Sequence, residues 1–208
     1  MKTHYQRRLP HVLPPGAVIF FTFRLAGSLP VAMIQQLAES RNIELQKAAN
    51  EPVEHQLEII AKIKKLQFAR FDTLLGQANY GPTWVSNPGI ARLVTEEILA
   101  LAELRVVVLA YCLMPNHVHL VVQLPDEADF SASRMMQRLK GRTALAANKL
   151  LHCQGQQFWQ HESYDHVVRH GKEEERVIAY VLNNPVKAGL VSDWTEWPYS
   201  YSCASGIM

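Results

Sequence analysis

The chain has 208 residues, of which 48% are hydrophobic, and carries a formal net charge of +2. This length supports one sizeable domain with a packed core, while the small net charge neither requires nor excludes a nucleic-acid partner. Three scattered cysteines without Cys-x-x-Cys spacing argue against a disulfide framework and a thiolate zinc site. Because the chain shows neither a membrane-spanning run nor a secretory leader pattern, we expect a cytoplasmic protein without a membrane partner.

The first predicted elements are a strand and a pair of helices. Residues 18–23 combine β-branched and aromatic side chains after a Pro-Pro-Gly turn, which is typical of a strand. Residues 31–75 then follow a helical pattern that is interrupted near Asn50-Glu51-Pro52. The apolar positions of this second stretch are Ile34, Leu37, Leu45, Leu57, Ile60, Ile63 and Leu66.

The next segments predict a helix followed by a hairpin of two strands. Asn87-Pro88 combines a favourable N-cap with proline at the first helical position, and the helix is expected to end near Glu103. Residues 104–114 form a nearly continuous apolar run, as in a central strand. The Pro115-Asn116 turn then leads into a second strand that should pair with the first.

The strand that begins at His117 carries the most informative pattern of the chain. Side chains alternate between the two faces of a strand, so His117 and His119 project together while Val118 and Leu120 face the core. We expect a metal-binding pair on the exposed or functional face of the sheet. The alternative is a pair of solvent-facing or hydrogen-bonded imidazoles.

Residues 130–151 return to helical spacing and carry a row of basic side chains. The row consists of Arg134, Arg138, Arg142 and Lys149. It indicates either an ordinary solvated helix face or a groove that follows a phosphate backbone.

The last predicted elements are a short strand at 164–169 and a helix that starts after Gly171 and stops at Pro185. Tyr180 and Asn184 are four residues apart, so a helix would bring the phenol and the carboxamide to one face. Sequence spacing alone also fits a half-buried tyrosine and an asparagine at the helix C-terminus.

Several blocks in this order together form a specific pattern. The chain resembles the REP-associated tyrosine transposases and, more widely, the single-strand insertion-sequence transposases of the HUH endonuclease superfamily. The blocks are Leu9-Pro10-His11, Pro14-Pro15-Gly16, Thr22-Phe23-Arg24-Leu25, Leu113-Met114-Pro115-Asn116-His117-Val118-His119, Phe158-Trp159-Gln160, Ser163-Tyr164-Asp165-His166, Tyr180-Val181-Leu182-Asn183-Asn184-Pro185-Val186-Lys187-Ala188-Gly189-Leu190-Val191, Asp193-Trp194 and Trp197-Pro198-Tyr199-Ser200.

The resemblance implies an α+β fold with a ferredoxin-like antiparallel sheet and packed helices, in a single domain over 1–208 with a helical insertion at about 31–75. It also implies that His117 and His119 hold a metal ion and that Tyr180 is the nucleophile. Asn184 would be the third ligand or a polar group beside the metal. The family points to Mg²⁺ or Mn²⁺, and imidazole suits manganese better than magnesium.

The function implied by the resemblance is cleavage and rejoining of single-stranded DNA at hairpin-associated repeats through a 5′-phosphotyrosine. A free phenol titrates near pH ~10 and needs assistance to attack a phosphate, which a bound divalent cation can supply. Arg134, Arg138, Arg142 and Lys149 would contact the DNA backbone. The chain length favours a monomer, and a homodimer stays open.

Two alternatives remain at the level of the sequence. The first is a DNA-binding protein that keeps the fold without covalent chemistry. The second is a small-molecule metallohydrolase that uses His-x-His, although Val121 stands where a His-x-His-x-Asp site needs a carboxylate. His166 and His170 precede the tyrosine, and neither is assigned as the proton acceptor.

Overall fold

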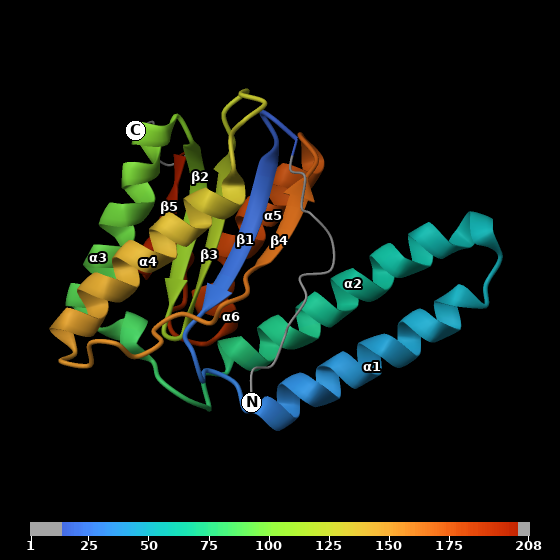
Figure 1. Ribbon diagram of the computed structural model, residues 1–208, viewed down its shortest axis with the longest axis horizontal. Coiled ribbons are helices and arrows are strands. Elements are labelled where there is room, and N and C mark those ends of the chain that lie inside the picture. The colour runs from blue at the N-terminus through green and yellow to red at the C-terminus, as the bar shows by residue number, and fades with distance from the viewer. Residues whose placement is uncertain (1–13, 204–208) are drawn as a thin grey trace.

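The computed structural model describes residues 14–203, so the Leu9-Pro10-His11 block of the resemblance lies outside the described residues. One antiparallel sheet has the strand order β4-β1-β3-β2-β5 (Figure 1). Its strands are β1 (Val18–Arg24), β2 (Val107–Met114), β3 (His117–Gln123), β4 (Tyr164–Val168) and β5 (Ser200–Ser202). The helices are α1 (Val31–Ala49), α2 (Val53–Gly76), α3 (Pro88–Leu99), α4 (Ala132–Leu150), α5 (Lys172–Leu182) and α6 (Asn184–Lys187). Short 3₁₀ turns are η1 (Trp84–Ser86), η2 (Ala100–Leu104) and η3 (Trp194–Glu196).

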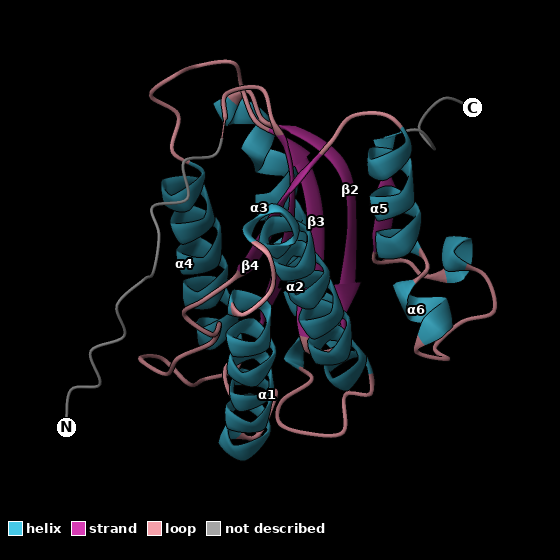
Figure 2. Ribbon diagram, turned by 90° about the vertical axis from the view of Figure 1, so that its right-hand side faces the viewer, coloured by secondary structure: helices cyan, strands magenta, loops and turns pink. Residues whose placement is uncertain are grey.

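The core of the fold is a β-α-β-β-α-β unit made in chain order by β1, α3, β2, β3, α4 and β4. Its four strands lie in the order β4-β1-β3-β2, and α3 and α4 cover one face (Figures 1 and 2). This is the ferredoxin-like α+β arrangement that the resemblance implied. The additional strand β5 pairs with the free edge of β2.

Alternation along β3 divides its side chains between two apolar layers. Val118, Leu120 and Val122 enter the core beneath α3 and α4. Val121 faces the opposite layer, which includes Val181 of α5, and the histidines share that face. The prediction of which β3 residues share a face is confirmed.

The predicted pair of helices is also confirmed, with α1 and α2 joined at residues 50–52. The predicted apolar stripe of α2 is only partly correct, because Leu57 is 81% exposed and Leu66 48% exposed. The buried side chains of α2 are Gln67, Asp72 and Leu75. A spacing of three residues drifts around a helix of 3.6 residues per turn, so the assumed stripe leaves the covered side.

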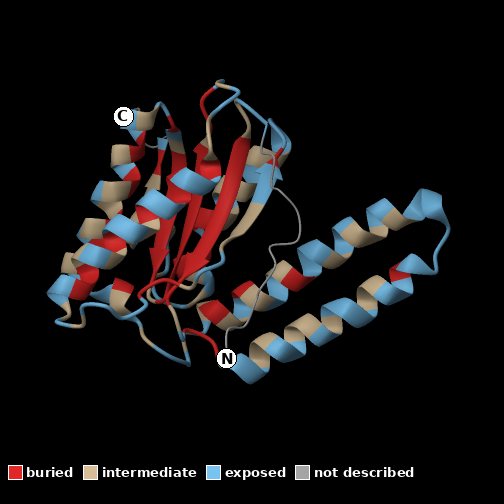
Figure 3. Cartoon of the chain, viewed as in Figure 1, coloured by how far each residue is buried: buried red, intermediate tan, exposed pale blue. Residues whose placement is uncertain are grey.

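The α1–α2 hairpin leaves and rejoins the fold at one point. Gly27 and Gly81 both have positive φ, and a Cβ on Gly81 would lie 2.1 Å from the Gly27 carbonyl oxygen. Much of the hairpin extends beyond the sheet (Figures 1 and 3). The hairpin is therefore an arm attached at its base.

Other predicted boundaries shift by a few residues. The helix expected to reach Glu103 ends at Leu99 and continues as η2, and Arg105 with φ 59° separates it from β2. The final helix ends at Leu182 rather than near Pro185, and Pro185 is the second residue of the short helix α6. Strand β5 was not predicted, since three residues carry too little pattern. Among the described helices, none combines the length and hydrophobicity that a membrane crossing requires.

Candidate functional site

The two histidines of β3 point into the layer beneath α2 and α5, with their Nε2 atoms 3.1 Å apart. Both side chains are 0% exposed. The expectation places the pair on an exposed or functional face, and exposure is wrong for the described structure because both imidazoles are covered. The reason is the C-terminal end of α2, which brings Asp72 against His119 and Leu75 against Asn116.

Each imidazole is oriented by a hydrogen bond at its other nitrogen. His117 Nδ1 lies 2.6 Å from the Asn116 side-chain oxygen, and His119 Nδ1 lies 2.8 Å from Thr22 Oγ1. The Asn116 amide nitrogen donates to the Leu75 carbonyl of α2, which leaves its oxygen for His117. Such contacts fix ring orientation in metal sites and direct the Nε2 atoms toward one point.

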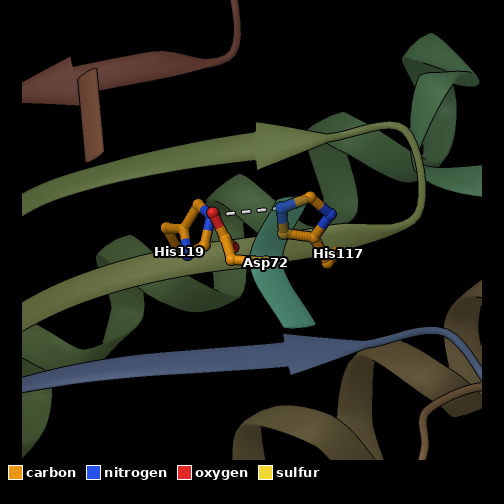
Figure 4. Close-up of side chains that lie close together, drawn as sticks. All are labelled: Asp72, His117 and His119. Carbon is orange, nitrogen blue, oxygen red and sulfur yellow. Dashed lines mark hydrogen bonds and ion pairs between the residues drawn. The ribbon is translucent and has the colours of Figure 1, made fainter. Parts of the chain in front are cut away.

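Asp72 of α2 is the site residue that the sequence did not reveal. One of its carboxylate oxygens, Oδ1, lies 3.2 Å from His119 Nε2, and the other, Oδ2, accepts a hydrogen bond from the Tyr180 hydroxyl. The residue is 2% exposed. Figure 4 shows the carboxylate beside both imidazoles. Its signal in the sequence was a carboxylate between Phe68 and Leu75, which lie four residues before and three after it.

The donor set fits a divalent cation. Nε2 of each histidine and a carboxylate oxygen of Asp72 lie within 4.8 Å of one another. His117 Nδ1 faces an acceptor and so carries the ring hydrogen, which leaves a lone pair on Nε2. His119 Nε2 carries at most one hydrogen, which cannot bond to both His117 Nε2 and Asp72 Oδ1. Asp72 Oδ1 lies within ion-pair distance of His119 Nε2, but the two atoms are not aligned for a hydrogen bond. A cation would accept lone pairs from all three groups.

The protonation states also suit metal binding. Burial, and then the adjacent His119, lowers the pKa of His117 to about 3, so its ring is neutral. Burial alone would raise the pKa of Asp72, but the adjacent His119 ring and the Tyr180 hydroxyl lower it below its ordinary value. A neutral imidazole and a carboxylate are the forms that bind metals.

Tyr180 of α5 lies next to this cluster. Its ring centroid is 5.9 Å from that of His119 and 6.2 Å from that of Phe20, and its hydroxyl donates to Asp72. Burial, followed by the negative charge of Asp72, raises the pKa of the phenol. In this arrangement the phenol is therefore a weaker nucleophile than a free tyrosine.

Asn184 lies beside Tyr180, although not on the same helix. It is 4% exposed, and its amide nitrogen donates to the Tyr180 backbone carbonyl at 2.9 Å. The predicted shared helix face is replaced by the turn between α5 and α6. The structure nevertheless brings together all the residues proposed for catalysis and metal binding.

Arg24 is a second group on this face with an unusual environment. It ends β1 directly opposite His117 in the sheet register, so the two side chains share a face. Arg24 is 7% exposed, donates from Nη1 to Ser28 Oγ, and lies 5.7 Å from the Phe71 ring centroid. Within residues 14–203, no carboxylate forms an ion pair with it. Burial lowers the pKa of Arg24, and the negative charge of Glu162 opposes this without an ion pair. A buried guanidinium with donors beyond the one used by Ser28 suits a phosphate.

The predicted basic row lies on the other side of the sheet. Helix α4 packs in the layer formed with α3, across the sheet from the histidines. Arg142 Nε lies 2.8 Å from both Glu97 carboxylate oxygens, and Arg138 lies 3.7 Å from Glu103. The row is therefore not brought to the cation site, and intramolecular ion pairs hold two of its members.

The unassigned histidines form exposed pairs with α5. His166 lies 3.3 Å from Glu173, and His170 lies 3.1 Å from Glu174. Neither has a contact with Tyr180 among the interactions of the described residues.

Comparison with known proteins supports the resemblance drawn from the motif blocks. The family described as "Transposase IS200 like" matches residues 92–184, a segment that includes both histidines, Tyr180 and Asn184. A REP-associated tyrosine transposase of Haemophilus influenzae is 31% identical over 99 residues, which cover 44% of this chain and 56% of that protein. One of Escherichia coli is 30% identical over 91 residues, covering 44% and 51%. The chain thus spans about half the length of these relatives.

The fold itself also has a solved counterpart. A structure of a REP-associated tyrosine transposase bound to a REP hairpin aligns with a TM-score of 0.52 at 18% identity. The alignment covers 96% of this chain and 82% of that chain. The likeness confirms the α+β fold, and the sequence matches confirm the resemblance to this type of transposase.

Proposed function

We propose that this protein cleaves and rejoins single-stranded DNA at hairpin-associated repeats, with Tyr180 as the nucleophile. The observation that carries the proposal is the meeting of Tyr180 with the His117–His119 pair in one buried cluster. The family match over residues 92–184 includes these residues, and a relative of the same fold was solved with a REP hairpin.

The cluster would hold Mg²⁺ or Mn²⁺ through His117 and His119, with Asn184 or Asp72 nearby. Two imidazole nitrogens favour manganese over magnesium. When bound, the cation would polarise a phosphodiester oxygen and stabilise charge on the leaving 3′ oxygen.

The protein side chains would bind and orient the DNA phosphate around Tyr180. The Arg24 guanidinium has donors beyond the one that Ser28 uses, and it would contact the phosphate beside the histidines. The Lys187 ammonium lies 5.6 Å from the Tyr180 ring centroid and would contact a neighbouring phosphate. Arg134 and Lys149 of α4 would contact DNA farther from the site.

The chemical step exchanges one phosphate ester for another. The Tyr180 oxygen would form a bond to phosphorus, the bond from phosphorus to the 3′ oxygen would break, and the phenol would lose its proton while the 3′ oxygen gains one. The products are a 5′-phosphotyrosine and a free 3′-hydroxyl. Since the ester linkage is conserved, a DNA 3′-hydroxyl can reverse the step without a nucleotide cofactor.

Access to this site requires a change in the position of α2. His117 and His119 are 0% exposed, and Asp72 of α2 is 2% exposed. A DNA strand therefore reaches them only after the end of α2 moves away from the sheet.

The test uses an end-labelled, hairpin-flanked single-stranded oligonucleotide with Mn²⁺. We expect a covalent protein–DNA adduct on a denaturing gel, abolished by Tyr180→Phe. Tyr164→Phe is the matched control, because Tyr164 belongs to the same aromatic cluster and stacks on Phe68 at 4.0 Å. Binding of the oligonucleotide without any adduct over a full range of Mn²⁺ and Mg²⁺ would instead establish the non-catalytic alternative.

A further inference from the structure

We infer that Asp72, carried by the inserted hairpin, is the third protein ligand of the cation centre, so that cation binding attaches α2 to the sheet. The inference rests on the cation site of the proposed function and deepens it. Asp72 lies outside the segment that matches the transposase family, which begins at residue 92. The hairpin would thus hold the DNA-free site closed, and Asp72 would leave the cation when the end of α2 moves away from the sheet to admit DNA.

The geometry of the cluster favours Asp72 as a ligand. Among residues 14–203, the Asp72 carboxylate oxygen and the two Nε2 atoms form the one group of three or more His, Cys, Asp or Glu side chains whose ligand atoms lie within 4.8 Å of one another. Asn184, the ligand expected from the resemblance, donates its amide nitrogen to the Tyr180 carbonyl, and its oxygen, the atom that could bind a metal, has no contact with either histidine among the interactions of the described residues. A carboxylate is a stronger ligand than a carboxamide for Mn²⁺ or Mg²⁺, because it carries charge.

The buried charge of Asp72 also favours a bound cation. Asp72 is 2% exposed, and its Oδ1 atom has no aligned hydrogen-bond donor. A buried carboxylate in that position is costly unless a positive charge compensates it. A divalent cation between Asp72 and the two imidazoles would supply such a charge.

The C-terminal end of α2 is held against the rest of the fold close to Asp72. Its contacts with the rest of the fold include Phe68 on Tyr164, Phe71 beneath Arg24, and the Leu75 carbonyl on Asn116. These residues surround Asp72 on the last turns of α2. Bonds from Asp72 to a cation would therefore act on the part of the hairpin that covers the histidines.

The direct test is Mn²⁺ binding without DNA, measured from the electron paramagnetic resonance signal of free Mn²⁺. We expect Asp72→Asn to weaken binding by about tenfold or more, as loss of a ligand implies. Glu44→Gln is the matched control, because Glu44 is a carboxylate of the same hairpin that binds Arg70 and Gln67 instead. Unchanged Mn²⁺ affinity in Asp72→Asn would overturn the inference.

A ligand exchange gives a result that loss of folding cannot imitate. In Asp72→Cys, a thiolate would replace the carboxylate and favour softer metals. We expect Cd²⁺ to produce a sulfur-to-cadmium charge-transfer band in this variant. The wild type, which already contains the buried Cys112 opposite His119, is the control and should show no band. A folded Asp72→Cys protein that gives no band with saturating Cd²⁺ contradicts the assignment.

Hydrogen exchange tests the attachment of the hairpin. We expect Mn²⁺ to slow amide exchange over the C-terminal half of α2 in the wild type and not in Asp72→Asn. Equal protection in both proteins would refute the coupling.

The proposed function is judged separately, because wild-type adduct formation with intact Mn²⁺ binding in Asp72→Asn would reject only the present inference. Absence of an adduct together with a loss of Mn²⁺ binding in Asp72→Asn would reject only the function.

Discussion

The Asp72 carboxylate serves two neighbours, since one oxygen lies against His119 and the other accepts the Tyr180 hydroxyl hydrogen. Removing the hydroxyl leaves a buried carboxylate oxygen without its donor. We expect Tyr180→Phe to lower the free energy of unfolding by about 1–3 kcal/mol in the presence of a chelator. Urea denaturation measures the change. Tyr164→Phe should differ from the wild type by less than about 0.5 kcal/mol, because its hydroxyl makes no hydrogen bond within residues 14–203. Equal effects would show that Tyr180 acts only through packing.

Arg24 is expected to contribute to DNA binding rather than to the stability of the fold. Its guanidinium is buried without an ion pair among the described residues, so replacing it with a shape-matched apolar side chain removes a desolvation cost. We expect Arg24→Met to leave the thermal midpoint unchanged or raised, while the affinity for single-stranded DNA falls by about tenfold or more. Fluorescence anisotropy checks the affinity.

Arg92→Gln is the control for Arg24, because Arg92 is an exposed arginine of α3 that pairs only weakly with Glu96 at 3.7 Å. Its DNA affinity should stay close to that of the wild type. A loss of stability in Arg24→Met without any loss of DNA affinity would make Arg24 a structural residue.

Helix α4 carries two kinds of basic side chain, those with a glutamate partner and those without one in the described part of the chain. Arg138 and Arg142 have glutamate partners, whereas Arg134 and Lys149 have none among the ion pairs of the described part of the chain. Replacing Arg134 and Lys149 with glutamine should weaken the salt dependence of DNA binding. The slope of log binding constant against log salt concentration should fall in magnitude by about one for each of these residues that contacts a phosphate. The same change at Arg138 and Arg142 should have less effect. A larger effect at Arg138 and Arg142 than at Arg134 and Lys149 would mean that DNA displaces the glutamate partners of the first pair.

The base of the α1–α2 hairpin depends on glycine in a way that can be tested with two alanines. Gly81 has φ +68°, and a Cβ there would lie 2.1 Å from the Gly27 carbonyl oxygen. We expect Gly81→Ala to destabilise the fold by more than about 1 kcal/mol. Gly76→Ala, where a Cβ meets nothing within 4 Å, should be neutral or stabilising by up to about 1 kcal/mol. Thermal unfolding of both variants provides the comparison.

At the scale of the whole molecule, the sheet and its two helical layers protect one thiol and leave two accessible. Cys112 is buried on the central strand β2, Cys153 is partly exposed, and Cys203 is exposed. Burial is the main cause that raises the pKa of Cys112 to about 12. We expect a disulfide reagent at neutral pH to modify Cys153 and Cys203 in the native protein, and Cys112 only after unfolding. Rapid modification of Cys112 would indicate that the sheet opens readily.

Local patterns determined much of this molecule. The alternation at His117-Val118-His119 correctly predicted which side chains share a face, and Asn87-Pro88 correctly marked the start of α3. The break at residues 50–52 likewise separated the two inserted helices. These features depend on backbone geometry and on contacts between near neighbours, which a linear pattern records.

Only the tertiary structure decided what covers each face. Periodicity shows that a helix has an inward side, but it does not identify the element on which that side packs. The burial of both histidines, the arrival of Asp72 beside Tyr180 and the placement of α4 across the sheet all depend on such long-range packing. Asp72 and His119 are far apart in the chain, so the final cluster exists only because the hairpin folds back onto β3.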